Sequence, residues 1–316
     1  MRRKAKYKWF LIITGFFIIA ILFLEISERK NSFLKSWLYE NNASSELVVA
    51  TVALTPDKNP AISGRKMMEL IGNIKETQPN VDLIFFGETI LGWYESGNKS
   101  YHNEIAESIP GATTDSIAKL AKENNVFISF GMVEQSDDKI YNSQVLVNDK
   151  GEIINVQRKK NVRSEGFNPG QESIALVDIR GVRAGIVICY DMRSSETISK
   201  ARNNADVIFL SNADYMDKWD KNHFGYQFLA KQFNAWIVTS NRYGKENNIQ
   251  WDGHIEILNP FGDLLVSGEM KEQFIVYNIK VNHNQSNIRY FIQKAYSKIS
   301  LVYLVIKNLR TGLAYL

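Results

Sequence analysis

Three residues with reactive or acidic side chains follow apolar runs that are typical of buried strands. Glu88 follows IFFG, Cys189 follows GIVI, and Asp214 lies just beyond the run VIFLS. Ligands of open α/β sheets bind at the carboxyl ends of strands, so the sequence predicts that these side chains share a site. Taken singly, each has an ordinary explanation, since a lone cysteine packs as a small hydrophobe and a glutamate caps a helix. Lys159, in the basic run QRKKN, is on its own typical of a solvated surface lysine.

The pattern that must position these residues alternates strands with helices. Short apolar or β-branched runs predict strands, and apolar residues at steps of three and four predict helices. The predicted strands are 47–54, 81–87, 126–132, 141–147, 152–158, 182–188, 206–211, 235–241, 253–258 and 263–267. The predicted helices are 62–74, 116–125, 194–204 and 219–233. This alternation predicts an α/β fold in one domain that spans residues 47–280.

The order glutamate, lysine, cysteine, together with four sequence blocks, resembles the carbon–nitrogen hydrolase (nitrilase) superfamily. FFGETILGWY resembles the first block of that family, with Gly87 where proline is usual. GEIINVQRKKNV is similar to G-x-I-x-x-x-Y-R-K-x-H-L, with Gln157 in place of tyrosine and Asn161 in place of histidine. AGIVICYDMRSSE is similar to G-x-x-I-C-Y-D-x-R-F-P-E, and GMVEQSDDKIYNSQVLV resembles the segment that carries a supporting glutamate. The resemblance covers about residues 47–280 and implies a four-layer α-β-β-α sandwich.

The resemblance implies a catalytic triad of Glu88, Lys159 and Cys189. A thiol with an ordinary pKa of about 8.5 is mostly protonated at neutral pH, so Glu88 is expected to remove its proton. Lys159 is expected to stabilise the oxyanion of the tetrahedral state, and Cys189 is expected to form a thioester. Glu134 is expected to orient Lys159 and to keep it charged.

The implied reaction is hydrolysis of a non-peptide carbon–nitrogen bond, in a linear amide or a related compound, and two alternatives stay open. SNADYMDKW resembles a segment of the apolipoprotein N-acyltransferase branch, which favours a membrane-associated N-acyltransferase with the same triad, whereas CYDMRSSE is amidase-like. Gln232 lies where many members have an acidic residue, which leaves a catalytically silent binding relative as the other alternative. The expected substrate pocket includes Tyr190, Asn212, Asp214 and Tyr215.

The composition excludes several other classes of protein. A chain of 316 residues with 45% hydrophobic and 23% charged residues is ordinary for a globular protein and unlike a disordered one. A single cysteine excludes an internal disulfide framework. The 4 histidines are scattered without metal-ligand spacing, so we expect neither a metal nor a cofactor. A net charge of +4 is too small to indicate nucleic acid as a partner.

Residues 1–27 predict a cytoplasmic basic leader and a transmembrane signal anchor. Arginine and lysine predominate in residues 2–8, and residues 9–24 run without a charge, somewhat short of the roughly 20 residues of a bilayer span. A cleaved signal peptide and a buried core helix are the alternatives, but no small-residue cleavage site follows. Residues 28–46 then form a stalk. The positive-inside rule places the catalytic domain outside the cytoplasm, on a single-pass protein of the cell membrane.

Residues 281–316 form a basic tail without an acidic residue, and its apolar positions recur at helical steps. This pattern predicts an amphipathic helix that either packs on protein, in the domain or in a dimer partner, or lies on anionic lipid. The expected partners are therefore a small-molecule or lipid-linked amide substrate and the membrane. The resemblance also implies a homodimer.

Overall fold

The computed structural model describes residues 36, 39–41, 43–214 and 219–283. The chain divides into two units, Met1–Asn42 and Ala43–Leu316. Among the described residues, none of the helices combines the length and the apolar character that a membrane crossing requires. The expected transmembrane segment, most of the stalk and the tail beyond residue 283 lie outside the described residues. The anchor, the stalk and the amphipathic tail therefore stay predictions.

The first half of the second unit builds one sheet. Its strands run in the order β5-β4-β3-β2-β1-β13. β1, β2 and β3 are parallel, and the others join them antiparallel. The strands are β1 (Ser45–Leu54), β2 (Leu83–Phe85), β3 (Phe127–Ser136), β4 (Lys139–Val147), β5 (Ile153–Arg158) and β13 (Gln273–Val281). The strands predicted at 141–147 and 152–158 form an antiparallel hairpin around residues 148–151, in which Val147 of β4 pairs with Ile153 of β5.

A second sheet follows, with β7, β8 and β9 parallel at its centre. Its strands are β6 (Ala175–Ile179), β7 (Val182–Ile188), β8 (Val207–Ser211), β9 (Trp236–Glu246), β11 (Glu256–Leu258) and β12 (Leu264–Ser267), and β10 (Ile249–Asp252) pairs with the end of β9. β1 and β9 join the two sheets through two parallel residue pairs, Ala53 with Asn241 and Leu54 with Arg242.

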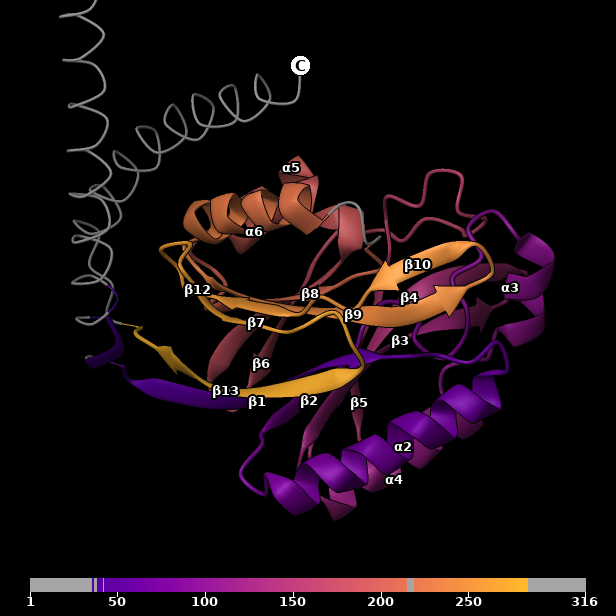
Figure 1. Ribbon diagram of the computed structural model, residues 1–316, viewed down its shortest axis with the longest axis horizontal. Coiled ribbons are helices and arrows are strands. Elements are labelled where there is room, and N and C mark those ends of the chain that lie inside the picture. The colour runs from indigo at the N-terminus through magenta and orange to yellow at the C-terminus, as the bar shows by residue number, and fades with distance from the viewer. Residues whose placement is uncertain (1–35, 37–38, 42, 215–218, 284–316) are drawn as a thin grey trace, which may run out of the picture. The chain divides into compact units, whose positions relative to one another are not determined.

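Helices cover the outer face of each sheet (Figure 1). α2 (Pro60–Thr77) and α4 (Ala112–Glu123) pack their apolar stripes on the first sheet, and α5 (Ser195–Ala201) and α6 (Trp219–Phe233) pack on the second. α2 begins where Asn59 accepts a hydrogen bond from the Ala61 N–H and Pro60 opens the first turn, an ordinary N-terminal cap. The remaining helices are the short α3 (Lys99–Ile105) and the 3-10 turn η1 (Cys189–Arg193).

The inner faces of the two sheets face each other. Phe85 of β2 meets Phe209 of β8 edge to face at 5.3 Å, and Ser211 Oγ donates to Gln144 Oε1 across the gap at 2.8 Å. Helix, sheet, sheet and helix therefore form the expected four layers. The strand predicted for residues 81–87 is shorter than expected and spans Leu83–Phe85, and Gly131 of β3 passes close to the chain just beyond it. A Cβ at Gly131 would lie 2.6 Å from the Gly87 carbonyl oxygen.

Candidate active site

Three turns at the carboxyl ends of strands carry the predicted triad. Glu88 follows β2, Lys159 directly follows β5, and Cys189 directly follows β7. Glu88 and Lys159 are buried, with 0% and 1% of their surface exposed, and Cys189 is half-buried. Cys189 adopts a φ of 43°, a left-handed conformation that is uncommon for a residue with a Cβ and typical of functional turns. The strand-end placement predicted from the sequence is what the structure shows.

Glu88 and Lys159 form a buried ion pair. Lys159 Nζ donates to Glu88 Oε1 at 2.8 Å, and Asn142 Nδ2 donates to the same oxygen at 2.6 Å. Glu88 Oε2 has no hydrogen-bond partner among the described residues. Burial by itself lowers the pKa of Lys159, but the charges of Glu88 and of the other groups nearby hold that pKa well above its usual value. The site therefore places the Lys159 ammonium beside a carboxyl group of which one oxygen makes no hydrogen bond within the described residues.

The thiol of Cys189 lies within the electrostatic reach of this pair. Burial raises the pKa of the thiol well above its usual value, and the charges of Glu88 and Asp214 raise it further. The ammonium of Lys159 and a hydrogen bond from the Ala213 N–H lower the pKa of the same thiol. The balance keeps the sulfur protonated at neutral pH, so it becomes a nucleophile only when a base removes its proton.

The role expected for Glu134 needs correction. Its carboxylate accepts hydrogen bonds from Arg158 Nε at 2.8 Å, from Arg158 Nη2 at 2.5 Å and from Ser143 Oγ at 2.6 Å. Besides Glu88, the carboxylate that contacts Lys159 belongs to Glu165, whose two oxygens each lie 2.9 Å from Lys159 Nζ. Glu134 lies on β3, and its side chain binds Arg158, the residue that precedes Lys159.

Glu165 is the residue that the sequence reasoning missed. Burial and the charge of Glu88 raise the pKa of Glu165, and Lys159 lowers it. The loop around Glu165 is fixed by two backbone bonds, from the Gly97 N–H to the Glu165 carbonyl and from the Glu165 N–H to the Val162 carbonyl. The only signal in the sequence was an acidic residue six positions after Lys159, in a stretch with neither helical nor strand periodicity.

The expected pocket residues lie around Cys189 in different ways. Asn212 is buried at the end of β8, where its Nδ2 donates to the Tyr226 hydroxyl at 2.8 Å, and that hydroxyl donates to Asp214. Tyr190 lies beside Cys189, with the Arg163 guanidinium 3.8 Å from its ring centre. Tyr215 lies outside the described residues, so its place in the pocket stays a prediction.

Gln232 lies away from the triad, on α6. Its backbone carbonyl accepts a hydrogen bond from Arg202 Nε at 3.1 Å. Among the described residues, no hydrogen bond joins the Gln232 side chain to the triad, and its Oε1 is buried without a partner. Its effect on activity stays untested. Within the same residues, no group of three or more histidine, cysteine or acidic side chains is arranged to hold a metal ion.

A buried arginine from the second sheet holds the turn that carries Glu88. Arg242 of β9 is fully buried, and its guanidinium donates to the Glu88 carbonyl, to Thr89 Oγ1 at 3.0 Å and to the Gly92 carbonyl at 2.6 Å. Glu246 balances its charge through a bond of 2.6 Å from Arg242 Nε. Thr89 has a φ of 44°, so this turn is strained as well as buried. The turn of Glu88 is thereby held from both sheets.

Comparison with known proteins agrees with this fold. The family model described as Carbon-nitrogen hydrolase matches residues 49–286. A probable nitrilase of Schizosaccharomyces pombe is 27% identical over 232 residues, which are 69% of this chain and 82% of that protein. An (R)-stereoselective amidase of a Pseudomonas species is 29% identical over 191 residues, which are 59% of this chain and 68% of that protein.

A solved structure shows the same fold. A Saccharomyces cerevisiae member of the nitrilase superfamily superposes with a TM-score of 0.68 at 20% identity, over 75% of this chain and 91% of that one. An α-β-β-α sandwich with glutamate, lysine and cysteine at strand ends, matched over most of its length, defines the class. The chain belongs to the carbon–nitrogen hydrolase family, and its relatives include nitrilases and amidases.

Proposed function

We propose that this protein hydrolyses the carbon–nitrogen bond of a linear amide or a related compound through a thioester on Cys189. The observation that carries the proposal is the state of the Glu88 carboxylate. One of its oxygens is bound by Lys159 and Asn142, and Oε2 has no partner among the described residues. A buried, oriented carboxylate with one unbonded oxygen is suited to accept a proton from a thiol whose own pKa is raised.

The reaction begins with transfer of the Cys189 proton to Glu88 Oε2 as the sulfur attacks the carbonyl carbon. The new C–S bond converts the carbonyl to an oxyanion, which the charged Lys159 ammonium stabilises more than it stabilises the neutral carbonyl. Glu88 then gives its proton to the leaving nitrogen, the C–N bond breaks, and an amine or ammonia departs. A thioester remains on Cys189.

Water completes the cycle. Glu88, a carboxylate again, takes a proton from the water that attacks the thioester, and a second oxyanion forms beside Lys159. This intermediate collapses to a carboxylic acid and a thiolate, and Glu88 returns the proton to the sulfur. The net reaction converts an amide and water to a carboxylic acid and an amine, and its balance includes no cofactor.

The relatives support hydrolysis of an amide over the alternatives kept open above. A Pseudomonas amidase and an omega-amidase of Bos taurus, which is 25% identical over 217 residues, are among them. N-acyl transfer would use the same thioester and differ only in the second nucleophile, an amine in place of water. A silent relative would not form the thioester.

The test is an intact-mass measurement on the full chain, incubated with a panel of aliphatic amides and nitriles. We expect an acyl adduct on the wild-type protein and release of acid, and neither in Cys189→Ala. Addition of a primary amine separates the alternatives, because an acyltransferase forms the N-acyl amine at the expense of the acid. Equal turnover by the wild type and Cys189→Ala would overturn the proposal.

A further inference from the structure

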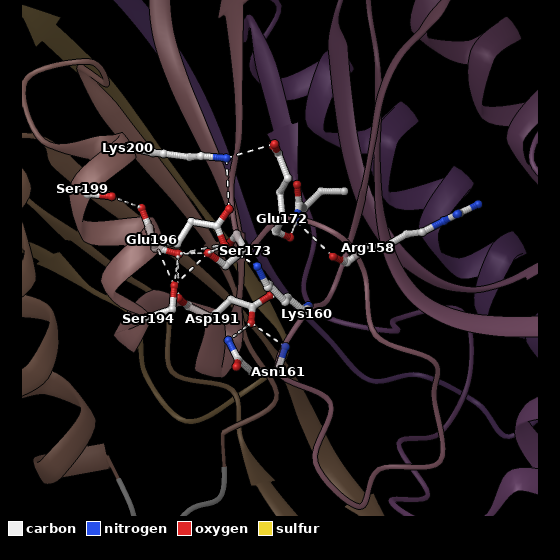
Figure 2. A network of polar contacts seen from close by, with 12 residues as sticks. Arg158, Lys160, Asn161, Glu172, Ser173, Asp191, Ser194, Glu196, Ser199 and Lys200 are labelled. Atoms are coloured by element: carbon white, nitrogen blue, oxygen red, sulfur yellow. Dashed lines mark hydrogen bonds and ion pairs between the residues drawn. The ribbon is translucent and has the colours of Figure 1, made fainter.

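The acidic residue of the turn that follows the nucleophile binds the chain that follows the catalytic lysine. Asp191 is completely buried within η1, two residues after Cys189. Its Oδ2 accepts a hydrogen bond from the Lys160 N–H at 2.8 Å, and its Oδ1 accepts one from the Asn161 N–H at 2.8 Å. Asn161 Nδ2 adds a third bond, of 2.5 Å, to Oδ1 (Figure 2). A single carboxylate therefore joins the loops of Cys189 and Lys159.

The bonds to Asp191 restrain the backbone beside Lys159. The peptide N–H of Lys160 belongs to the same planar unit as the Lys159 carbonyl, so fixing one fixes the other. Two further bonds act on Lys159 itself, since its N–H donates to the Asn142 carbonyl and its carbonyl accepts from the Gly170 N–H, both at 2.8 Å. Of these contacts, only those made by Asp191 relate Lys159 to the turn of the nucleophile.

The main chain of Asp191 is bonded to the start of the helix that follows the turn. The Asp191 carbonyl accepts hydrogen bonds from Thr197 Oγ1 at 2.7 Å and from the Ser194 N–H at 3.0 Å. These donors lie at the start of α5, which packs in the core of the second sheet. Lys159 follows β5 of the first sheet, so the Asp191 carboxylate bridges the two sheets at the site.

We propose that Asp191 is a positioning residue that sets the place of the Lys159 ammonium relative to the Cys189 sulfur. The inference rests on the proposed triad, because it gives Asp191 no contact with the reacting atoms. Charge-assisted bonds from two consecutive backbone N–H groups are stronger and more directional than neutral ones. A shift of about 1 Å in a catalytic group lowers rates by about 100-fold, so a bridge of this kind governs turnover.

Asn161 also takes part in the hydrogen bonds to Asp191. In the family block it occupies the position where histidine is usual, and here its side-chain amide donates to the Asp191 oxygen that already binds its backbone N–H. Its removal leaves both backbone bonds in place. Asn161→Ala is therefore a milder test of the same bridge than a change at Asp191.

The experiment compares Asp191→Asn with Glu196→Gln in the full chain. Both changes replace a carboxylate by an amide within one polar network (Figure 2). Glu196 binds the side chains of Lys160, Lys200 and Ser173 and touches no backbone next to Lys159. An amide at position 191 presents an N–H₂ group to a backbone N–H and breaks the bridge, whereas Glu196→Gln weakens only bonds to other side chains.

Two readouts are needed, of which the first is turnover. We expect Asp191→Asn to lower kcat by about 100-fold with less than threefold change in KM, and Glu196→Gln to leave both within about threefold. Asn161→Ala should lower kcat by roughly three- to tenfold. If Asp191→Asn retains kcat within threefold while its melting temperature falls, its role is structural and the proposal is overturned.

The second readout does not depend on a substrate. The chain has one cysteine, so alkylation by iodoacetamide reports on Cys189 alone. Lys159 lowers the pKa of this thiol, so displacement of the ammonium should move the midpoint of the alkylation profile to higher pH. We expect the shift in Asp191→Asn, a smaller one in Asn161→Ala, and none in Glu196→Gln.

The same readout separates the two hypotheses. If the wild type hydrolyses no amide and forms no acyl adduct, the proposed function fails, and the alkylation profiles still test the bridge. If Asp191→Asn does not fold, Asn161→Ala gives the answer. An Asn161→Ala profile and kcat identical to those of the wild type would overturn the proposal.

Discussion

Arg158 and Lys159 are neighbouring cations at the end of β5, and the ion pair of Arg158 with Glu134 differs from that of Lys159 with Glu88. The Arg158 side chain is 34% exposed and holds Glu134 by two bonds, with Ser143 adding a third. The side chains of Lys159 and Glu88 are 1% and 0% exposed, and the ammonium binds only one of the two carboxylate oxygens of Glu88. Successive side chains of a strand point to opposite faces, which separates the pairs although their cations are adjacent.

The two glutamates differ in how many of their carboxylate oxygens are hydrogen-bonded. Both oxygens of Glu134 are bound by the guanidinium, whose planar fork matches a carboxylate, so the pair braces β3 against β5. Glu88 keeps Oε2 without a hydrogen-bond partner among the described residues. A saturated pair stabilises structure, whereas a buried, unsaturated pair is able to exchange a proton. This comparison predicts a graded series of mutant effects.

Loss of the proton acceptor should have the largest effect. Glu88→Gln keeps the size of the side chain and removes its basicity, so we expect kcat to fall by at least about 10³-fold, approaching the inactive Cys189→Ala. Initial rates with the amide identified by the intact-mass screen measure this. Activity within tenfold of the wild type would remove Glu88 from the mechanism.

Loss of the Lys159 ammonium should have the second-largest effect on kcat. Lys159→Ala removes the charge that stabilises the oxyanion, and we expect kcat to fall by about 10²–10³-fold, as for the loss of one oxyanion donor. It also leaves Glu88 and Glu165 without their shared cation, so the melting temperature should fall too. Kinetics measured well below that temperature separate the two effects, and unchanged kinetics there would contradict the assignment.

Glu165 and Glu134 form a matched pair for the third prediction. Glu165→Gln leaves a group that still contacts Lys159 but carries no charge, so we expect kcat to fall by about 10–100-fold with a small change in stability. Glu134→Gln should instead lower the free energy of unfolding by about 1–3 kcal/mol and leave kcat within about fivefold. Urea unfolding and initial rates on both variants decide, and the reverse pattern would restore the expected role of Glu134.

A buried acid without a cation gives the smallest effect on turnover. Asp252 accepts bonds from Asn241 Nδ2 and the His254 N–H, its Oδ2 has no partner among the described residues, and burial raises its pKa to about 7. Between about pH 4 and 7 the folded protein therefore holds a proton that the unfolded chain has released, so stability falls as the pH rises through this range. Asp252→Asn should abolish that fall and leave kcat within about threefold.

Urea unfolding of the wild type and Asp252→Asn at pH 5 and pH 8 measures this prediction. The wild type should lose stability between these two values relative to the variant. A parallel pH dependence in the two proteins would show that Asp252 does not titrate in this range.

Much of the fold followed from the sequence because the central strands are apolar on both faces. β1, β2, β7 and β8 were each predicted from such runs. β6 and β13 were not, since β6 alternates between half-buried and exposed positions and β13 is half-buried along most of its length. Their pairing depends on strands distant in the sequence, for which local periodicity gives no signal.

The site shows the same limit. Residues fixed at strand ends, Glu88 and Cys189, were identified, because a buried strand determines where the next residue lies. Glu165 lies in a loop, and no local pattern in the sequence indicates which acidic residue that loop places against Lys159. Arg158 ends β5 and Lys159 follows it, and the opposite directions of these two side chains decide which glutamate each one binds. Those directions follow from the strand register, which is known only when the neighbouring strand is known.

Arg242 has a consequence for any redesign of this enzyme. This side chain of the second sheet binds three groups on the turn of Glu88, which belongs to the first sheet, and it is buried together with its counter-ion Glu246. Variation near Glu88 therefore disturbs two sheets at once, whereas Tyr190, half-buried and bound mainly through its ring, can change locally. Mutant libraries that seek new substrates should therefore vary residues next to Cys189, such as Tyr190, and leave the turn of residues 88–92 unchanged.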